Sequence, residues 1–261
     1  MNPRHLSVAE IEAWLARLKY PRAEVLRILA ADPRRTIRDL AARYERRRQA
    51  AYAERLRLRR LYRAERERRI GQLVAGVDEV GRGCLAGPVV AAAVILPDGR
   101  RIKGLDDSKQ LARSIRERLD NTIRSQAVAV AVAEASVEEI NQLNILGASR
   151  VAMRRALESL LPPPNFALVD GRDRLPLDLE HAAVVRGDAS CACVAAASIV
   201  AKVARDRLMD ELDGAYPGYG FARHKGYGTD EHLVALGRLG PSLIHRSAFL
   251  PVVQAALFEW P

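Results

Sequence analysis

Three short apolar runs between residues 73 and 136 constrain the fold more than any other feature of the chain. The runs are LVAGVDEV, GPVVAAAVILP and AVAVAVAEAS, and their length and apolar content are typical of β-strands. A glycine-rich segment, GRGCLAG, joins the first two. Because the three runs follow one another closely, we expect them to pair as an antiparallel meander.

Beyond the meander, segments with helical spacing alternate with further strands. Residues 144–160 and 190–212 are predicted helices, and residues 165–170 and 181–188 are predicted strands. Three strands followed by this alternation predict a mixed α/β layer architecture. No run reaches the roughly 18 apolar residues that a membrane span needs, so we expect no membrane partner.

Residues 1–72 have a different character and are predicted to form a separate, all-helical extension before a domain at 73–261. Ser7 and Glu10 have the spacing of a capping box, and apolar residues then recur at helical intervals. Two or three small helices are expected, followed by a long charged helix through YERRRQAAYAERLRLRRLYRAERERR.

The positive charge of the chain lies in this extension. Residues 1–72 hold 20 Lys or Arg and 9 Asp or Glu, a net charge of +11, which leaves 22 basic and 23 acidic residues for the remainder. A basic segment on a neutral body favours contact with a polyanion such as nucleic acid. A solvated helix face is the alternative.

The cysteine content indicates a reducing compartment. Cys84, Cys191 and Cys193 form an odd and sparse set, which argues against a disulfide framework. We therefore expect three reduced thiols in a cytoplasmic protein.

Four carboxylates stand at the ends of predicted strands. Asp78 and Glu79 end the first strand, and Asp170 and Asp188 end two later ones. Strand ends are where ligands gather in open α/β sheets, so the four acids would converge if these strands are neighbours. A cluster of this kind repels itself unless a cation compensates, and incomplete oxygen coordination suits Mg²⁺ or Mn²⁺. The alternative is that the acids only cap or turn the chain, with Asp188 as the N-cap of the next helix.

Five segments, in order, resemble the signatures of the ribonuclease HII family. They are LVAGVDEVGRGCLAGPVVAAAVILP, LDDSKQL, LVDG, GDASCACVAAASIVAKVARD and YGFARHKGYGT, and PSLIHRSAF is similar to the family's ending. The likeness covers about residues 73–250, and the helical extension resembles one carried by a subset of bacterial members.

This resemblance implies a ribonuclease H-like fold with a mixed sheet of about five strands. It implies an endoribonuclease that hydrolyses the RNA strand of RNA–DNA hybrids and cuts 5′ of single ribonucleotides in duplex DNA, leaving 3′-OH and 5′-phosphate ends. Asp78, Glu79, Asp170 and Asp188 would be the catalytic acids, holding two Mg²⁺ or Mn²⁺ ions during catalysis.

The resemblance also implies substrate contacts. Gly81, Arg82 and Gly83 match the family's substrate-reading motif, where glycines let the backbone approach the 2′-OH that separates RNA from DNA. Tyr227 matches a tyrosine at the ribose of the RNA–DNA junction. Lys109 and Lys225 are expected to contact phosphates, with a role in the fold or simple exposure as the alternative.

Some family positions differ here, and other motif residues have plainer explanations. Ser190, Cys191 and Cys193 replace the lysine and serines usual after the GD pair, so we expect phosphate binding there to be weaker or absent; Asp106 replaces a frequent asparagine. Lys202 and Asp206 have the spacing of a helical ion pair. Tyr216, Tyr219 and Phe221 are expected to pack a turn.

Two rival functions remain open. One is a nucleic-acid binding protein whose acids are structural, and the other is a general nuclease or integrase of the same fold. A further partner, the replication sliding clamp, is suggested by Gln254–Phe258, which resembles a clamp-binding peptide. A packed C-terminal helix is the alternative for that segment.

Overall fold

The computed structural model describes residues 6–18, 20–68, 72–172 and 175–257. The chain divides into two compact units, Met1–Arg59 and Arg60–Pro261. Each unit has its own buried apolar cluster, so we describe them separately.

The first unit is helical, as predicted. Its helices are α1 (Val8–Arg17), α2 (Ala23–Ala30) and α3 (Arg35–Leu61), of which α3 continues past the unit's end. The Ser7 hydroxyl accepts from the Glu10 N–H, and the Glu10 carboxylate accepts from the Ser7 N–H, which confirms the capping box. The buried core of this unit consists of Ile11, Leu15, Leu26, Leu29, Ile37, Leu40, Ala41 and Tyr44.

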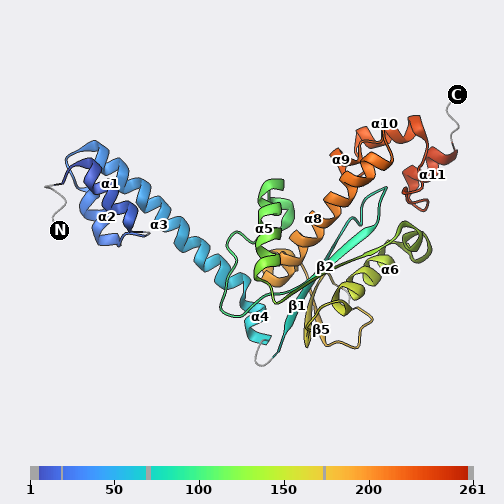
Figure 1. The fold of residues 1–261 in the computed structure, drawn as a ribbon, viewed down its shortest axis with the longest axis horizontal. Helices are drawn as coiled ribbons and strands as arrows, with labels where there is room; N and C mark the ends of the chain where they lie inside the picture. The colour runs from blue at the N-terminus through green and yellow to red at the C-terminus, as the bar shows by residue number, and fades with distance from the viewer. Residues whose placement is uncertain (1–5, 19, 69–71, 173–174, 258–261) are drawn as a thin grey trace. The chain divides into compact units, whose positions relative to one another are not determined.

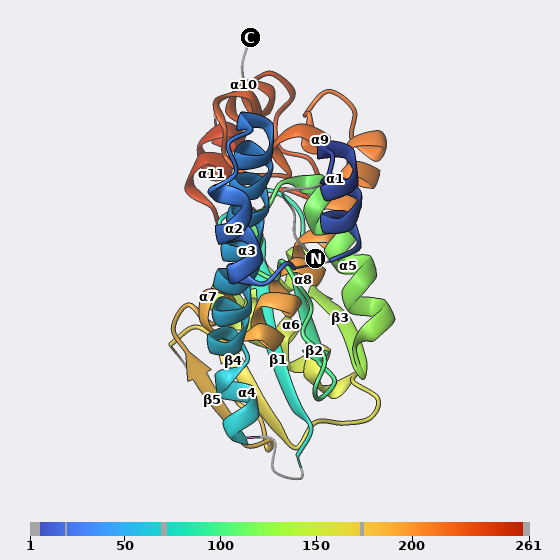
Figure 2. The ribbon, with the colours of Figure 1, turned by 90° about the vertical axis from the view of Figure 1, so that its left-hand side faces the viewer.

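The second unit is built on a mixed sheet that has five strands in the described residues, in the order β3-β2-β1-β4-β5 (Figure 2). The strands are β1 (Val74–Val80), β2 (Val89–Ile95), β3 (Ala129–Ala135), β4 (Phe166–Asp170) and β5 (His181–Val184). Neighbours in β1-β2-β3 are antiparallel, whereas β4 is parallel to β1 and β5 to β4. The predicted meander and mixed sheet are therefore confirmed.

One predicted strand end is wrong. The strand expected over 181–188 stops at Val184, and Asp188 lies instead in the short helix α7 (Gly187–Ser190). Arg186 takes a left-handed conformation (φ 55°, ψ 47°), which turns the chain out of the sheet. Nor does Asp188 cap the next helix, α8 (Ala192–Ala215), because the N-cap residue of α8 is Cys191.

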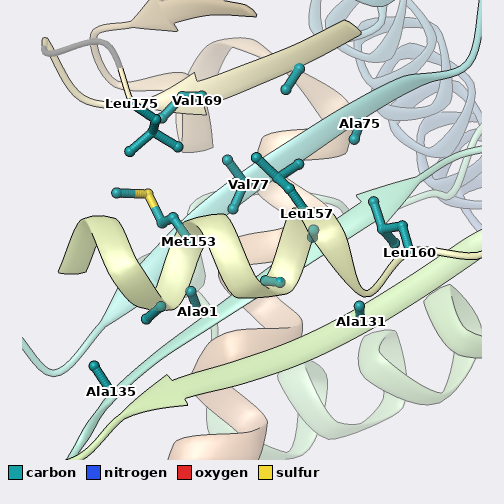
Figure 3. Close-up of a cluster of buried hydrophobic side chains, with 14 of the residues drawn as sticks. Ala75, Val77, Ala91, Ala131, Ala135, Met153, Leu157, Leu160, Val169 and Leu175 are labelled. Carbon is teal, nitrogen blue, oxygen red and sulfur yellow. The ribbon is translucent and has the colours of Figure 1, made fainter. Parts of the chain in front are cut away.

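Two long helices cover opposite faces of the sheet (Figure 1). On one face lies α6 (Val137–Glu158), whose Met153 and Leu157 pack against Ala75 and Val77 of β1 (Figure 3). On the other face lies α8, so close to β1 that a Cβ on Gly76 would stand 2.2 Å from the Cys193 carbonyl carbon. Strand alternation then directs Asp78, two residues after Gly76, toward α8 as well.

The remaining elements surround this core. They are α4 (Arg63–Arg68), the 3₁₀ helix η2 (Ser108–Gln110), α5 (Arg113–Gln126), α9 (Phe221–His224), α10 (Asp230–Leu239) and α11 (Leu250–Leu257). Helix α5 lies in the connection between β2 and β3, where no helix had been predicted. Buried Glu65 of α4 accepts a hydrogen bond from the Cys193 N–H in the first turn of α8. Within the described residues, no helix combines the length and the apolar character that crossing a bilayer requires.

Candidate active site

Asp78 and Asp170 lie side by side because their strands are parallel. Val77 pairs with Val169, and each acid is the next residue along its own strand. Asp78 is 5% exposed, and its carboxylate accepts from the Glu79 N–H at 2.8 Å. The Asp170 carboxylate accepts from the Gly187 N–H at 2.7 Å, which ties β4 to α7. Two carboxylates from distant parts of the sequence therefore meet at one sheet edge.

Burial dominates the electrostatics of this edge. It raises the pKa of Asp78 well above the ordinary value, and the nearby Glu79 and Asp170 carboxylates raise it further, against a hydrogen bond from Ser198. Burial also raises the pKa values of Glu79 and Asp170. Repulsion from Asp188 adds to the shift at Asp170, and Asp170 in turn raises the pKa values of Asp78 and Glu79, so Asp170 lies within electrostatic reach of the other three predicted acids.

One oxygen of this cluster has no hydrogen-bond donor. Glu79 Oε1 accepts from Arg82 Nη1 at 3.2 Å, but Glu79 Oε2 is buried, and nothing in the described residues donates a hydrogen bond to it. A buried, unsatisfied carboxylate oxygen beside other carboxylates suits a hard cation. The four acids therefore fit a divalent ion by their chemistry, although no three His, Cys, Asp or Glu among the described residues are grouped closely enough to enclose one.

The segment around Lys109 contacts the same edge. Lys109 Nζ lies 3.6 Å from Asp188 Oδ2, and the side chain of Lys109 is 78% exposed. The Ser108 and Ser198 hydroxyls are 2.8 Å apart, and Ser198 lowers the pKa of Asp78 against the effect of burial. The Lys109 head group therefore stands beside the acids with most of its surface open to solvent.

Gly81, Arg82, Gly83 and Tyr227, which we call the glycine–tyrosine surface, come together from two loops. Cys84 pairs with Tyr227 in an isolated bridge, and the Leu85 N–H donates to the Gly226 carbonyl at 2.8 Å. Gly81 has φ +96°, and a Cβ there would stand 2.3 Å from Arg205 Nε, so only glycine fits. The Arg82–Glu79 ion pair links this surface to the acids.

Two buried arginines, which the sequence had not singled out, hold these loops. The Arg205 guanidinium donates to the carbonyls of Ala86, Pro88 and Lys225. The Arg246 guanidinium donates to those of Arg82, Gly87 and Pro88. Both side chains are fully buried, and burial lowers the pKa of Arg246 to about 10. Each arginine lies in a segment that resembles the family, and this was the only indication of its importance in the sequence. The segment does not predict which carbonyls the guanidinium contacts.

Lys225 is placed differently from Lys109. It is 8% exposed, and its ammonium donates to the Asp210 carboxylate and, at 3.1 Å, to the Asp206 carbonyl. This placement favours the alternative considered for Lys225, a role in holding the fold, over a direct phosphate contact.

Other predicted residues have structural partners. Lys202 Nζ pairs with Asp206 at 2.7 Å, which confirms the helical ion pair. Tyr219 and Phe221 stack with ring centroids 5.2 Å apart and are buried, as expected for residues that pack a turn.

The residues that differ from the family pattern divide into two kinds. Cys191 and Cys193 are buried, as is Cys84, and none of the three forms a disulfide within the described residues. Ser190 is exposed, and its hydroxyl donates to the Arg186 carbonyl at 2.9 Å. Among residues 190, 191 and 193, only residue 190 therefore has a side chain open to solvent.

Comparison with known proteins identifies the family to which this chain is similar. The model of the ribonuclease HII family matches residues 75–251, and that of the ribonuclease HII N-terminal domain matches residues 7–69. The chain is 50% identical over 261 residues to a ribonuclease HII of Anaeromyxobacter sp. (strain Fw109-5), covering 98% of this chain and 83% of that protein.

Solved structures show the same fold. The ribonuclease H2 of Pyrococcus horikoshii OT3 matches with a TM-score of 0.59 at 27% identity, covering 70% of this chain and 97% of that one. The PCNA:RNase HII complex of Archaeoglobus fulgidus matches with a TM-score of 0.56 at 28% identity, covering 67% and 93%. The sheet order, the family match and these relatives agree, and the chain belongs to the ribonuclease HII family of endoribonucleases, which hydrolyse the RNA strand of RNA–DNA hybrids.

Proposed function

We propose that this chain hydrolyses the RNA strand of RNA–DNA hybrids and cuts duplex DNA on the 5′ side of a single embedded ribonucleotide, leaving 3′-OH and 5′-phosphate ends. Such an activity would serve ribonucleotide excision repair in the cytoplasm. The observation that carries the proposal is the placement of the Asp78–Asp170 edge beside the glycine–tyrosine surface, joined through the Arg82–Glu79 ion pair. Hydrolysis of the phosphodiester and recognition of the ribose would then take place at neighbouring positions of the substrate.

The four acids Asp78, Glu79, Asp170 and Asp188 would hold two Mg²⁺ or Mn²⁺ ions. When bound, such ions supply an activated water and a counter-charge for the phosphate oxygens. The support from this chain is the raised pKa of Asp78 and the buried Glu79 Oε2, to which no described residue donates, because both call for a nearby positive charge. The carboxylates themselves would hold and orient the ions. Without the ions, their negative charge would repel the phosphate of the substrate.

Recognition would be divided among the neighbouring residues. Arg82 and Gly83 are exposed, and the backbone at Gly83, which carries no side chain, can approach a ribose closely. Tyr227 is 37% exposed, so its ring can stack on the ribose and its hydroxyl can hydrogen-bond the 2′-OH. Arg82 and Lys109 carry exposed cationic heads for phosphates on either side. Lys225 would contribute indirectly, since its carbonyl and ammonium both hold the Tyr227 loop in place.

The basic extension would add affinity without sequence preference. We retain residues 1–72 as the proposed extension and 73–261 as the proposed catalytic domain. Helix α3 exposes Arg46, Arg47 and Arg55, among other arginines, to solvent. Cations of this kind attract phosphates and release counterions, so they would strengthen duplex binding in a salt-dependent way.

A sliding clamp is proposed as a weaker partner through Gln254–Phe258. Gln254 lies on α11 and is exposed, whereas Phe258 falls outside the described residues. The support is the peptide-like sequence together with the related ribonuclease HII that was solved in complex with PCNA. Pulldown by a bacterial clamp, abolished in the Leu257→Ala/Phe258→Ala variant, is the expected result; equal capture of both proteins would refute the contact.

The decisive experiment uses a labelled DNA duplex with one ribonucleotide, in Mg²⁺ and then in Mn²⁺. All-DNA duplex and a long RNA–DNA hybrid are the controls. A single nick immediately 5′ of the ribonucleotide, absent from all-DNA, is expected. Tight, salt-sensitive binding without cleavage would favour the binding-protein alternative, and cleavage of all-DNA would favour a general nuclease.

A further inference from the structure

Three buried histidines lie behind Tyr227 and take no part in the site described above. His224 belongs to α9, His232 to α10, and His245 to the segment between α10 and α11. Their exposed fractions are 8%, 0% and 3%. The rings of His224 and His232 stack at 4.4 Å between centroids, and those of His232 and His245 are 5.2 Å apart. Such burial of titratable rings calls for a role.

The hydrogen bonds around these rings specify where each proton sits. The Ser242 N–H donates to His245 Nδ1 at 2.9 Å, so this nitrogen accepts and the ring carries its proton on Nε2. His245 Nε2 lies 3.0 Å from His232 Nε2, which must then accept. The proton of His232 is therefore on Nδ1, which lies 2.9 Å from the Tyr227 carbonyl oxygen. Donation runs in one direction, from Ser242 through both rings to Tyr227.

The same cluster fixes the rest of the tyrosine loop. His224 Nδ1 accepts from the Gly226 N–H at 3.2 Å, and His224 Nε2 lies 2.8 Å from the Tyr219 carbonyl. The Tyr227 carbonyl also accepts from the Thr229 N–H at 2.8 Å. The carbonyl of residue 227 is thus held by buried groups, although Tyr227 as a whole is 37% exposed.

We propose that His232 and His245 are positioning residues for ribose recognition: a relay of two neutral imidazoles fixes the Tyr227 carbonyl and thereby the direction of the Tyr227 ring. This rests on the proposed ribose contact of Tyr227. The relay needs both rings neutral. A second proton on His245 would point its Nδ1–H at the Ser242 N–H, and a second proton on His232 would point its Nε2–H at the His245 Nε2–H. Burial lowers the pKa of both histidines, that of His245 to about 4, which agrees with neutral rings at physiological pH.

Two variants of one residue separate positioning from packing. In His232→Asn the amide nitrogen hangs from Cγ, as Nδ1 does, and keeps its donation to the Tyr227 carbonyl. In His232→Gln the amide replaces Nε2 instead, so that donation is removed. We expect His232→Gln to lower kcat/KM on the single-ribonucleotide duplex by about 10- to 100-fold, the cost of a misplaced binding group. His232→Asn should stay within a few fold of the wild type.

A double-mutant cycle decides whether the effect passes through Tyr227. In a Tyr227→Ala background, His232→Gln should cause no further loss of kcat/KM, since the ring to be positioned is gone. An equal loss in both backgrounds, or an equal loss in the Asn and Gln variants, would overturn the proposal by showing a general structural effect.

The relay can also be tested without any activity. ¹⁵N NMR of the imidazoles in the wild-type protein near pH 7.5 should show His245 protonated on Nε2 and His232 on Nδ1. Any other tautomer, or a charged ring, would overturn the relay itself. A wild-type protein that cuts no ribonucleotide substrate would instead overturn the proposed function and the ribose part of this inference, whatever the tautomers show.

Discussion

The four acids sit on two parallel strands and a short helix, whereas the glycine–tyrosine surface consists of two loops that buried side chains hold together. At the acids, burial and mutual repulsion raise pKa values, and Glu79 Oε2 has no donor among the described residues. At the surface, two buried guanidiniums and the His232 imidazole donate to the carbonyls of Ala86, Gly87, Pro88, Lys225 and Tyr227, among others. The acids on the strands and short helix thus lack compensating positive charge, whereas the loops are held by many side-chain hydrogen bonds.

The difference fits the roles that we propose for the two regions. Acids that must accept a cation cannot be neutralised by the protein beforehand, so they cost stability in the free state. Loops that must present a ring and a bare backbone lack strand pairing of their own, so other side chains have to fix them. Removing one of the acids should therefore stabilise the free protein, whereas removing a side chain that holds the loops should destabilise it.

The largest effect is expected for Asp78→Asn. Because its pKa is raised in the folded state, this carboxyl contributes stability that is fully present below pH 3.8 and is lost as pH rises through the folded pKa, so ionising the side chain destabilises the fold. Without metal, thermal denaturation should show a higher Tm for the variant, by about 2–4 °C per kcal/mol relieved. Cleavage should fall on the order of 1,000-fold or more while substrate binding persists, because several kcal/mol of charge stabilisation disappears.

Asp120→Asn is the matched control for this variant. Asp120 is also buried, but Arg124 Nε lies 2.9 Å and Arg207 Nη1 3.7 Å from its oxygens. Its removal should lower Tm and leave cleavage near the wild-type rate. Near-normal turnover in Asp78→Asn would refute the proposed role of Asp78 in holding a metal ion. A fall in the Tm of this variant would contradict the contrast between the two regions.

Arg246→Lys should have the next largest effect, in the opposite direction for stability. The Arg246 guanidinium donates hydrogen bonds to the carbonyls of Arg82, Gly87 and Pro88, and the compact ammonium of a lysine cannot reach all three. Each carbonyl left unbonded costs about 1–3 kcal/mol, measurable by urea denaturation. Arg238→Lys, at an exposed guanidinium, is the control and should change little. Equal stability of both variants would show that the loops do not depend on Arg246.

The histidine relay predicts a smaller, pH-dependent effect. Burial depresses the pKa of His245 from 6.5 to about 4, so its contribution to stability is present above pH 6.5 and is lost as pH falls toward 4. The stability difference between wild type and His245→Gln should therefore shrink by about 1–3 kcal/mol between pH 7.5 and pH 4. Denaturation curves at several pH values measure it, and a constant difference would contradict the depressed pKa.

The smallest effect is expected in the basic extension, where the exposed arginines of α3 add only general attraction. Arg46→Gln/Arg47→Gln/Arg55→Gln should leave kcat unchanged and reduce the slope of log affinity against log salt by about 0.9 for each phosphate that the extension no longer neutralises. Lysines at the same three positions keep the charge and form the control. If the triple glutamine variant keeps the wild-type slope, the extension does not bind the duplex through these residues.

Local pattern was enough to predict the elements whose reasons are local. The Ser7–Glu10 capping box, the three antiparallel strands and the ends of β1 and β4 follow from residue spacing within a few positions. Asp78 and Asp170 could be chosen because a carboxylate directly after an apolar strand is visible in the sequence. Asp188 was chosen too, but the prediction that it ends a strand was wrong. The left-handed conformation of Arg186, which follows β5, cannot be recognised from the pattern of apolar residues.

The partners of buried polar groups were decided by the tertiary structure alone. A guanidinium such as Arg246 bonds whichever carbonyls the folded chain brings to it, and these lie about 160 residues away in sequence. Likewise, the tautomers of His232 and His245 depend on Ser242 and Tyr227 meeting across two rings. The sequence by itself thus determined the strands β1 and β4 and the acids at their ends, because both depend on neighbouring residues. Only packing determined how the glycine–tyrosine surface is held, because burial leaves each polar atom to find its partner in space rather than along the chain.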